Sequence, residues 1–128
     1  TGVTLVCDCR YPFSCSFEHL LSTLTDCFNA VGFSLADHRN SPGLFMAPDS
    51  ELVKTLLSVY EENIGHRARP LAIGGGTYAR AFPNTVAFGL VKEGEASQCH
   101  MPDESIALND IRFNTVVIAE AIRRLAGK

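Results

Sequence analysis

The sequence predicts an α/β fold, because segments with the two-residue periodicity of strands alternate with segments that have the periodicity of helices. Residues 3–10 place apolar side chains at every second position, whereas residues 17–31 repeat them at helical spacing. Residues 85–91 are apolar on both faces, which is typical of a parallel strand covered by helices on each side. With 128 residues, the chain is long enough for one ordinary domain.

Residues 3–38 are expected to form a β-α-β unit. Ser14 or Ser16 can cap the start of its helix, and Gly32 suits the left-handed position just past the end. A second strand should follow at residues 33–36. The face of the first strand that is expected to lie in the core consists of Val3, Leu5, Cys7 and Cys9.

Residues 39–48 are rich in Asn, Ser, Pro and Gly, which is loop composition, and they mark the expected boundary between two units. The first unit is residues 1–44 and the second is residues 45–128. Asp49 can cap a helix that ends at Gly65, and residues 71–73 read as a short strand. A last helix, about residues 109–125, is expected to bury Ile111, Val117, Ile118, Ala121, Ile122 and Leu125.

Composition excludes two classes of partner. Apolar residues make up 46% of the chain and charged residues 20%, which is typical of a globular protein. The net charge of −3 leaves no basic surface for nucleic acid, and no stretch is long and apolar enough to span a membrane. Five cysteines, an odd number, without a secretory segment predict reduced thiols and a cytoplasmic protein.

A run of three glycines, Gly74-Gly75-Gly76, follows the short strand at residues 71–73. Glycines let a backbone approach a ligand closely and leave several N–H groups unencumbered. The dinucleotide-binding pattern and the phosphate-loop pattern both fail to match here. The run therefore indicates either a tight turn or a loop that faces a ligand.

His100 follows the predicted buried strand, where α/β proteins place their ligand sites. Asp103 and Glu104 lie three and four residues further on, and such carboxylates can orient a metal-binding imidazole. At the end of the first strand, Arg10 is either a solvated side chain or the partner of a substrate carboxylate, which it can bind with two parallel hydrogen bonds.

Together these segments resemble the C-terminal part of the metallopeptidases of family 20. The resemblance is closest to the bacterial dipeptidase branch of that family. Residues 8–12 (Asp-Cys-Arg-Tyr-Pro) are similar to a strand end of the family's lid domain. Residues 48–56 look like the helix by which the chain re-enters the catalytic domain. Residues 73–80 and 100–105 resemble the substrate loop and the final metal-ligand motif.

The resemblance implies a β-α-β part of a ferredoxin-like lid domain, followed by the C-terminal part of a zinc-peptidase-like α/β catalytic domain. It implies that His100 ligates one of two zinc ions and that Arg10 holds the carboxylate of a dipeptide. Asp103 and Glu104 would support the metal ligand without binding metal. The residues that would line the substrate are Gly75, Gly76 and Thr77. Asp8 departs from the asparagine common in the family, and its charge would partly neutralise Arg10.

The family's remaining metal ligands and its general base, a glutamate, have no counterpart in this sequence. One histidine cannot hold two metal ions. We therefore expect the chain to be an inactive fragment of a dipeptidase, with its general base upstream, and to self-associate through exposed apolar faces or a strand edge.

Other interpretations remain open. The parent could be a related amidohydrolase, such as succinyl-diaminopimelate desuccinylase or an aminoacylase. Alternatively, the chain is a non-catalytic α/β module that binds a small anion or mediates oligomerisation.

Overall fold

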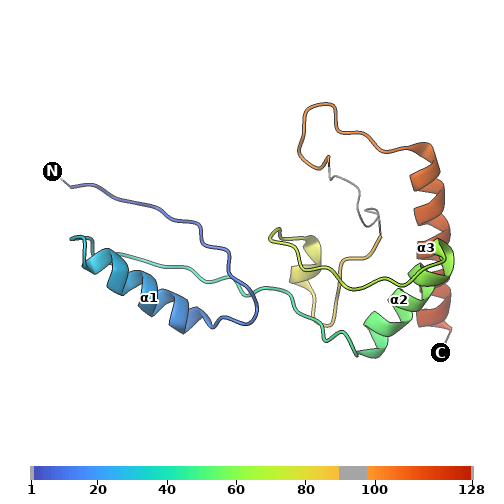
Figure 1. Ribbon diagram of the computed structural model, residues 1–128, viewed down its shortest axis with the longest axis horizontal. Coiled ribbons are helices and arrows are strands. Elements are labelled where there is room, and N and C mark those ends of the chain that lie inside the picture. Colours follow the sequence, from blue (N-terminus) through green and yellow to red (C-terminus); the bar gives the residue numbers. More distant parts are fainter. Residues whose placement is uncertain (1, 90–97, 128) are drawn as a thin grey trace.

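Helices and long connecting segments make up the computed structural model, which describes residues 2–89 and 98–127 (Figure 1). Three α-helices occur along the described chain: α1 (Phe17–Asn29), α2 (Glu51–Ile64) and α3 (Leu108–Ala126). A 3-10 turn, η1 (Tyr78–Ala81), follows the glycine run. Helices α2 and α3 pack against each other, whereas α1 lies apart from both of them (Figure 1).

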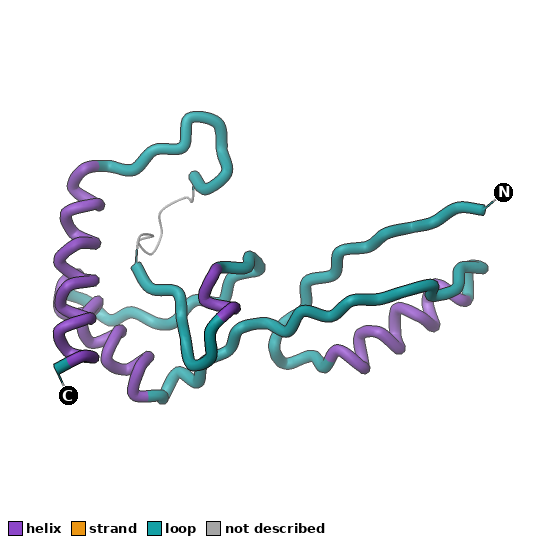
Figure 2. Tube along the Cα trace, turned by 180° about the vertical axis from the view of Figure 1, so that it is seen from behind, coloured by secondary structure: helices purple, strands orange, loops and turns teal. Residues whose placement is uncertain are grey.

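The predicted strands are absent from the described residues, so the β-α-β, ferredoxin-like unit and the α/β class are corrected to a mostly helical fold (Figure 2). A strand exists only where its backbone groups pair with a neighbour. Residues 3–10, 33–36, 71–73 and 85–89 form no such ladder with one another. Leu90 and Val91, the end of the last predicted strand, lie outside the described part of the chain.

The expected core face of the first segment is exposed. Val3 retains 82% of its accessible surface and Leu5 retains 55%, and both Cys7 and Cys9 are exposed free thiols. Alternating apolar residues form the buried face of a sheet only if the segment pairs with a neighbouring strand. This segment has no such partner among the described residues, so its apolar side chains stay uncovered. The predicted placement of both cysteines in the core is therefore wrong.

Helix α1 begins where Ser16 accepts a hydrogen bond from the backbone N–H of His19, at 3.2 Å. This confirms Ser16 as one of the two expected caps. The chain leaves the helix through Gly32, whose φ of 87° lies in the left-handed region. The helix has an apolar stripe, but all of its members remain partly exposed: Phe17, Leu20, Leu21, Leu24 and Phe28.

Helix α2 is capped by Ser50, which accepts a hydrogen bond from the N–H of Val53 at 3.3 Å, and not by Asp49 as predicted. The predicted end is confirmed, because Gly65 follows with a φ of 79° and donates its N–H to the carbonyl of Glu61. Helix α3 begins after Ala107 without a side-chain cap. Its last turn carries Arg123 and Arg124, as expected for a helix C-terminus.

The core is a small cluster between α2 and α3. Val59 and Val117 have no accessible surface, and Leu56 and Ala121 are nearly as buried. The ring of Tyr60 meets that of Phe113 edge-on, with centroids 6.3 Å apart. Most of the predicted buried set of α3 is exposed, because the described helix has one helical neighbour rather than a sheet. The exposed members are Ile111, Ile118, Ile122 and Leu125.

Accessible surface shows how little of the chain is covered. The molecule exposes 10440 Å², whereas a compact monomer of 13.9 kDa would expose about 6,700 Å². Large apolar side chains from all regions contribute to this surface, including Val6, Phe13, Phe82 and Ile122. The chain alone therefore does not bury the apolar surface that its sequence supplies.

Adjacent valines on α3 provide a matched test of the core. Val117→Ala should lower the free energy of unfolding by about 2 kcal/mol, because it removes two buried methyl groups and leaves a cavity. Val116→Ala, at a position that is 57% exposed, should change it by less than about 0.5 kcal/mol. Urea unfolding followed by helical circular dichroism measures both, and equal effects would contradict the proposed packing of α2 on α3.

Candidate functional site

Arg10 and the glycine run, two of the predicted substrate-binding elements, lie next to each other in the structure. Nη1 of Arg10 donates a hydrogen bond to the carbonyl oxygen of Gly74 at 3.0 Å, across 64 residues of sequence. Because the contact uses one nitrogen, the guanidinium still offers Nη2 to a ligand. The fold thus brings a cation to the edge of a loop rich in unencumbered backbone N–H groups.

The charge of Arg10 is partly balanced by Asp8. Its carboxylate lies 3.6 Å from Nε of Arg10, as the sequence suggested. The two side chains are 68% and 80% exposed, so water screens this ion pair and weakens it. Arg10 therefore keeps an accessible positive charge beside the glycine run.

Thr77 is occupied locally. Its side-chain oxygen accepts a hydrogen bond from the N–H of Ala79 at 3.2 Å and so caps the 3-10 turn η1. The hydroxyl can still donate its proton, because capping uses only a lone pair. Gly75 and Gly76 precede it in an exposed segment, where a Cβ on Gly75 would meet no atom within 4 Å.

Residues 38–45 pack back on the segment that carries Arg10. The hydroxyl of Tyr11 donates to Oδ1 of Asn40 at 2.9 Å. The rings of Phe13 and Phe45 stack with centroids 4.1 Å apart and an angle of 11° between their planes. These contacts fold residues 38–45 back against the segment that immediately follows Arg10.

His100 lies in a loop that supplies its own support. The φ angle of His100 is 64° and that of Asp103 is 60°, a left-handed conformation that non-glycine residues seldom adopt. The N–H of His100 donates to Oε2 of Glu104 at 3.2 Å, and the N–H of Glu104 donates to the carbonyl of Met101. Glu104 therefore supports the backbone of His100, whereas the sequence suggested that it would orient the imidazole.

No group of three or more His, Cys, Asp or Glu side chains within residues 2–89 and 98–127 is arranged to hold a metal ion. His100 is exposed, and its described hydrogen bond stays within its own loop. A dinuclear zinc centre needs several protein ligands. The described residues therefore do not build a metal centre by themselves, and His100 can supply only one donor.

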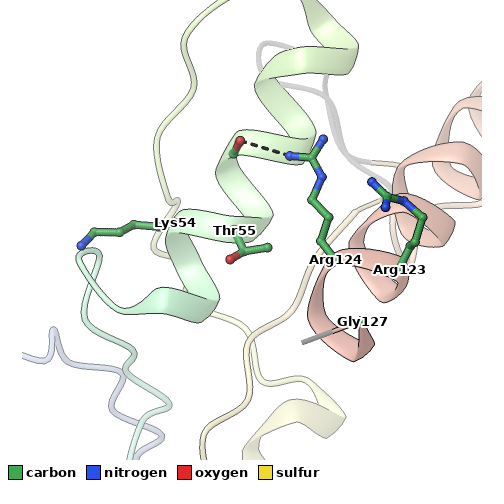
Figure 3. Close-up of a pocket in the computed structure, with 6 residues that line it drawn as sticks. Lys54, Thr55, Arg123, Arg124 and Gly127 are labelled. Carbon is green, nitrogen blue, oxygen red and sulfur yellow. Dashed lines mark hydrogen bonds between the residues drawn. The ribbon is translucent and has the colours of Figure 1, made fainter.

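Charged side chains cluster at a different place, a shallow hollow of about 580 Å³ between α2 and α3 (Figure 3). Arg124 points from α3 toward α2, where its guanidinium binds both carboxylate oxygens of Glu62 at 2.9 and 2.5 Å. Arg124 also donates to Ser58 and to Glu120, and Arg123 binds Glu120 through two nitrogens. These partners engage both guanidinium groups. The charged cluster therefore joins the two helices through ion pairs and is not a free anion-binding site.

These contacts shift the titration of both carboxyl groups. Hydrogen bonds from Arg124 lower the pKa of Glu62 from its ordinary value of 4.5 to about 2, with a smaller contribution from Ser58. Hydrogen bonds from Arg123 and then from Arg124 lower the pKa of Glu120 to about 2. Both groups are therefore ionised over the whole physiological pH range. A general base needs a pKa near the operating pH, so these two carboxylates have a structural role.

The sequence missed the contacts of Arg80. Its guanidinium donates to the carbonyl oxygens of Ser41 and Pro42, each at 3.3 Å, and makes a close contact with Oγ of Ser41. A basic residue in an exposed loop carries no signal of partners 38 and 39 residues away. The one signal in the sequence is that Arg80 lies close behind the glycine run, four residues after Gly76.

Comparison with known proteins identifies the class. Residues 6–124 match the family model described as Peptidase family M20/M25/M40, so the chain belongs to this peptidase family. Members of the family are generally metal-dependent. No solved structure matches the chain significantly.

Two curated relatives illustrate the match. The chain is 36% identical over 98% of its length to the "Putative dipeptidase YtjP" of Bacillus subtilis (strain 168). It is 31% identical over 95% of its length to the Beta-Ala-Xaa dipeptidase of Lactobacillus delbrueckii subsp. lactis. In both comparisons the chain spans 26% of the relative, about a quarter of its length.

Within the described part of the chain, no helix is both long and apolar enough to cross a membrane. Cys7, Cys9, Cys15 and Cys27 are free thiols.

The contacts of Arg124 lead to a prediction about pH. Because folding lowers the pKa of Glu62 and Glu120, their contribution to stability is complete above about pH 4.5 and is lost as the pH falls toward about 2. Arg124→Met should lower the melting temperature at pH 7 and make it less sensitive to acid over this range. Thermal melts between pH 2 and 7, followed by circular dichroism, measure both effects.

Arg112→Met serves as the matched control, because Arg112 is an exposed arginine on the same helix. This variant should keep the acid sensitivity of the unsubstituted chain. Identical pH profiles for the Arg124 and Arg112 variants would show that the ion pairs of Arg124 do not stabilise the pair of helices.

Proposed function

We propose that this chain is the C-terminal quarter of a metal-dependent dipeptidase that hydrolyses short peptides with free termini. Membership of the peptidase family and two relatives named as dipeptidases support the reaction class. The observation that supports the substrate is the position of Arg10, an exposed guanidinium fixed to the carbonyl of Gly74. A cation there suits the carboxylate that ends a dipeptide.

The proposed roles follow from the chemistry of the residues. Arg10 binds the carboxylate of the substrate and so selects short peptides, because the charge must fall a fixed distance from the scissile bond. The N–H groups of Gly75 and Gly76, together with the hydroxyl of Thr77, donate to the substrate backbone. Asp103 and Glu104 hold the loop of His100, Glu104 through the backbone N–H of that residue.

His100 is proposed as one ligand of a zinc centre whose other ligands come from the remainder of a longer polypeptide. A neutral imidazole is a suitable ligand, and a loop that fixes its backbone limits the entropy lost on binding. Zinc in such a centre acts as a Lewis acid and lowers the pKa of a water molecule. We propose that the general base also lies in that remainder, so the 128-residue chain alone is inactive.

Surface area supports the proposal that these residues normally contact further protein. The chain exposes roughly half as much area again as a compact monomer of its mass. An apolar hollow of about 410 Å³ beside the core is lined by Leu52, Leu56, Val86, Phe88, Ile118 and Ile122, among others. The free thiols of Cys7, Cys9, Cys15 and Cys27 are consistent with a reducing compartment, for which we propose the cytoplasm.

The activity is tested on a longer polypeptide that contains this chain. We expect it to release amino acids from unblocked dipeptides, to lose that activity on exhaustive dialysis against a chelator, and to regain it with zinc. His100→Ala should lower the zinc content, measured by atomic emission, together with the activity. Hydrolysis that survives removal of all metal would refute the proposal, as would a His100→Ala variant with full zinc and full activity.

The uncovered apolar surface should make the 128-residue chain itself associate. Since its apolar side chains are uncovered, sedimentation velocity should show association that increases with protein concentration. Ile122→Lys, at a position that is 61% exposed beside the apolar hollow, should weaken association, whereas Ala119→Lys on the exposed surface of the same helix serves as control. A chain that remains monomeric at all concentrations would contradict this expectation.

A further inference from the structure

Four contacts join three distant segments into a closed ring, which we call the linking ring. Arg10 donates to the carbonyl of Gly74, and its neighbour Tyr11 donates to Asn40. Arg80 donates to Ser41 and Pro42, directly after Asn40. Because Arg80 is six residues from Gly74, the path returns to Arg10 through the glycine run. Each contact therefore restrains the others.

Arg80 also lies directly over the glycine run. A Cβ placed on Gly76 would lie 2.8 Å from Nη1 of Arg80, which is closer than real side chains approach, and 3.4 Å from its Cδ. Gly76 needs no unusual backbone angle, because its φ is not in the positive region. The absence of a side chain at this position thus lets the arginine pass over the backbone and reach Ser41.

Neighbouring glycines differ in this respect. A Cβ on Gly75 or on Gly74 would meet no atom within 4 Å. Of the three consecutive glycines, Gly76 alone is crowded by a side chain, and that side chain is Arg80. The position of Arg80 therefore requires that Gly76, unlike Gly74 and Gly75, carries no side chain.

We infer that Arg80 is a positioning residue, which fixes the glycine run against residues 39–42 and thereby sets the position of Arg10 beside that run. Through this ring, Arg80 determines how well the enzyme recognises a substrate carboxylate without touching the substrate itself. The second statement rests on the proposed function, whereas the first concerns the chain alone. The two parts are therefore tested separately.

The first test measures backbone order in the isotopically labelled 128-residue chain by NMR relaxation, at a dilution where it is monomeric or with Ile122→Lys as background. In the unsubstituted chain, amide order parameters at residues 39–41 and 74–79 should lie near the rigid value of about 0.85. Arg80→Ala should lower the order parameters of both segments toward the flexible range below about 0.6. Arg69→Ala, in an exposed segment outside the ring, should leave them unchanged.

Gly76→Ala tests the coupling with the glycine run. Its methyl group must displace Arg80, so it should reproduce the loss of order in Arg80→Ala, whereas Gly75→Ala should not. In the Arg80→Ala background, Gly76→Ala should have no further effect, because the side chain that it displaces is gone. Full order at residues 39–41 in Arg80→Ala, or equal effects of the two glycine variants, would overturn the inference.

The second test uses the longer polypeptide and compares a dipeptide with the same dipeptide bearing a C-terminal amide. If Arg80 sets the position of Arg10, Arg80→Ala should reduce the kcat/KM ratio of acid to amide by about tenfold, chiefly through KM. Arg80→Lys, which can reach one carbonyl, should restore part of that preference. A uniform loss of activity on both substrates would overturn the positioning role in recognition.

Failure of the dipeptidase proposal can be distinguished from failure of the inference about Arg80. If the unsubstituted polypeptide hydrolyses neither substrate, the dipeptidase proposal fails. The NMR result on the linking ring still decides whether Arg80 holds the glycine run in place. An acid-to-amide ratio that Arg80→Ala leaves unchanged, in an enzyme that is active and prefers the acid, refutes the role of Arg80 alone.

Discussion

The contact between α2 and α3 is the constraint on which the rest of the structure depends. Val59 and Val117 are the largest fully buried side chains described, and the few buried residues around them come from these two helices. Beside this core, Arg124 binds Glu62 on the opposite helix with two nitrogens. Burial supplies the non-directional part of the stabilisation, while the fork of the guanidinium fixes the rotation of one helix against the other. The glycine run and the loop of His100 both extend from this pair.

The two candidate functional elements are held in different ways. His100 depends on contacts within its own loop, chiefly the carboxylate of Glu104 at its backbone N–H. Arg10 depends on contacts between segments up to 64 residues apart, through Gly74, Asn40 and Arg80. Local contacts lose little chain entropy when they form, whereas distant ones must be held by the remainder of the fold. We therefore expect the position of Arg10 to be more sensitive to changes elsewhere in the molecule than that of His100.

Helices could be predicted from the sequence, and strands could not. Spacing of apolar residues placed α1, α2 and α3 correctly, because helix hydrogen bonds lie within the segment. Alternation at residues 3–10 predicts a strand, but a strand needs a partner, and periodicity cannot reveal whether one is present. Caps were partly predictable: Ser16 and Gly65 were expected, but Ser50 replaced its neighbour Asp49. At the site, residue type suggested Arg10 as an anion binder, while the bridging role of Arg80 required coordinates.

The separation of α2 and α3 along the chain has a consequence for how the protein reaches its native state. Glu62 and Arg124 lie 62 residues apart, so their pairing closes a long loop. The entropy of loop closure grows with the logarithm of length, and doubling the loop would add only about 0.6 kcal/mol. Insertions between the two helices should therefore be tolerated at equilibrium. Folding is slowed instead, since the helices must find each other by diffusion before any burial stabilises the encounter.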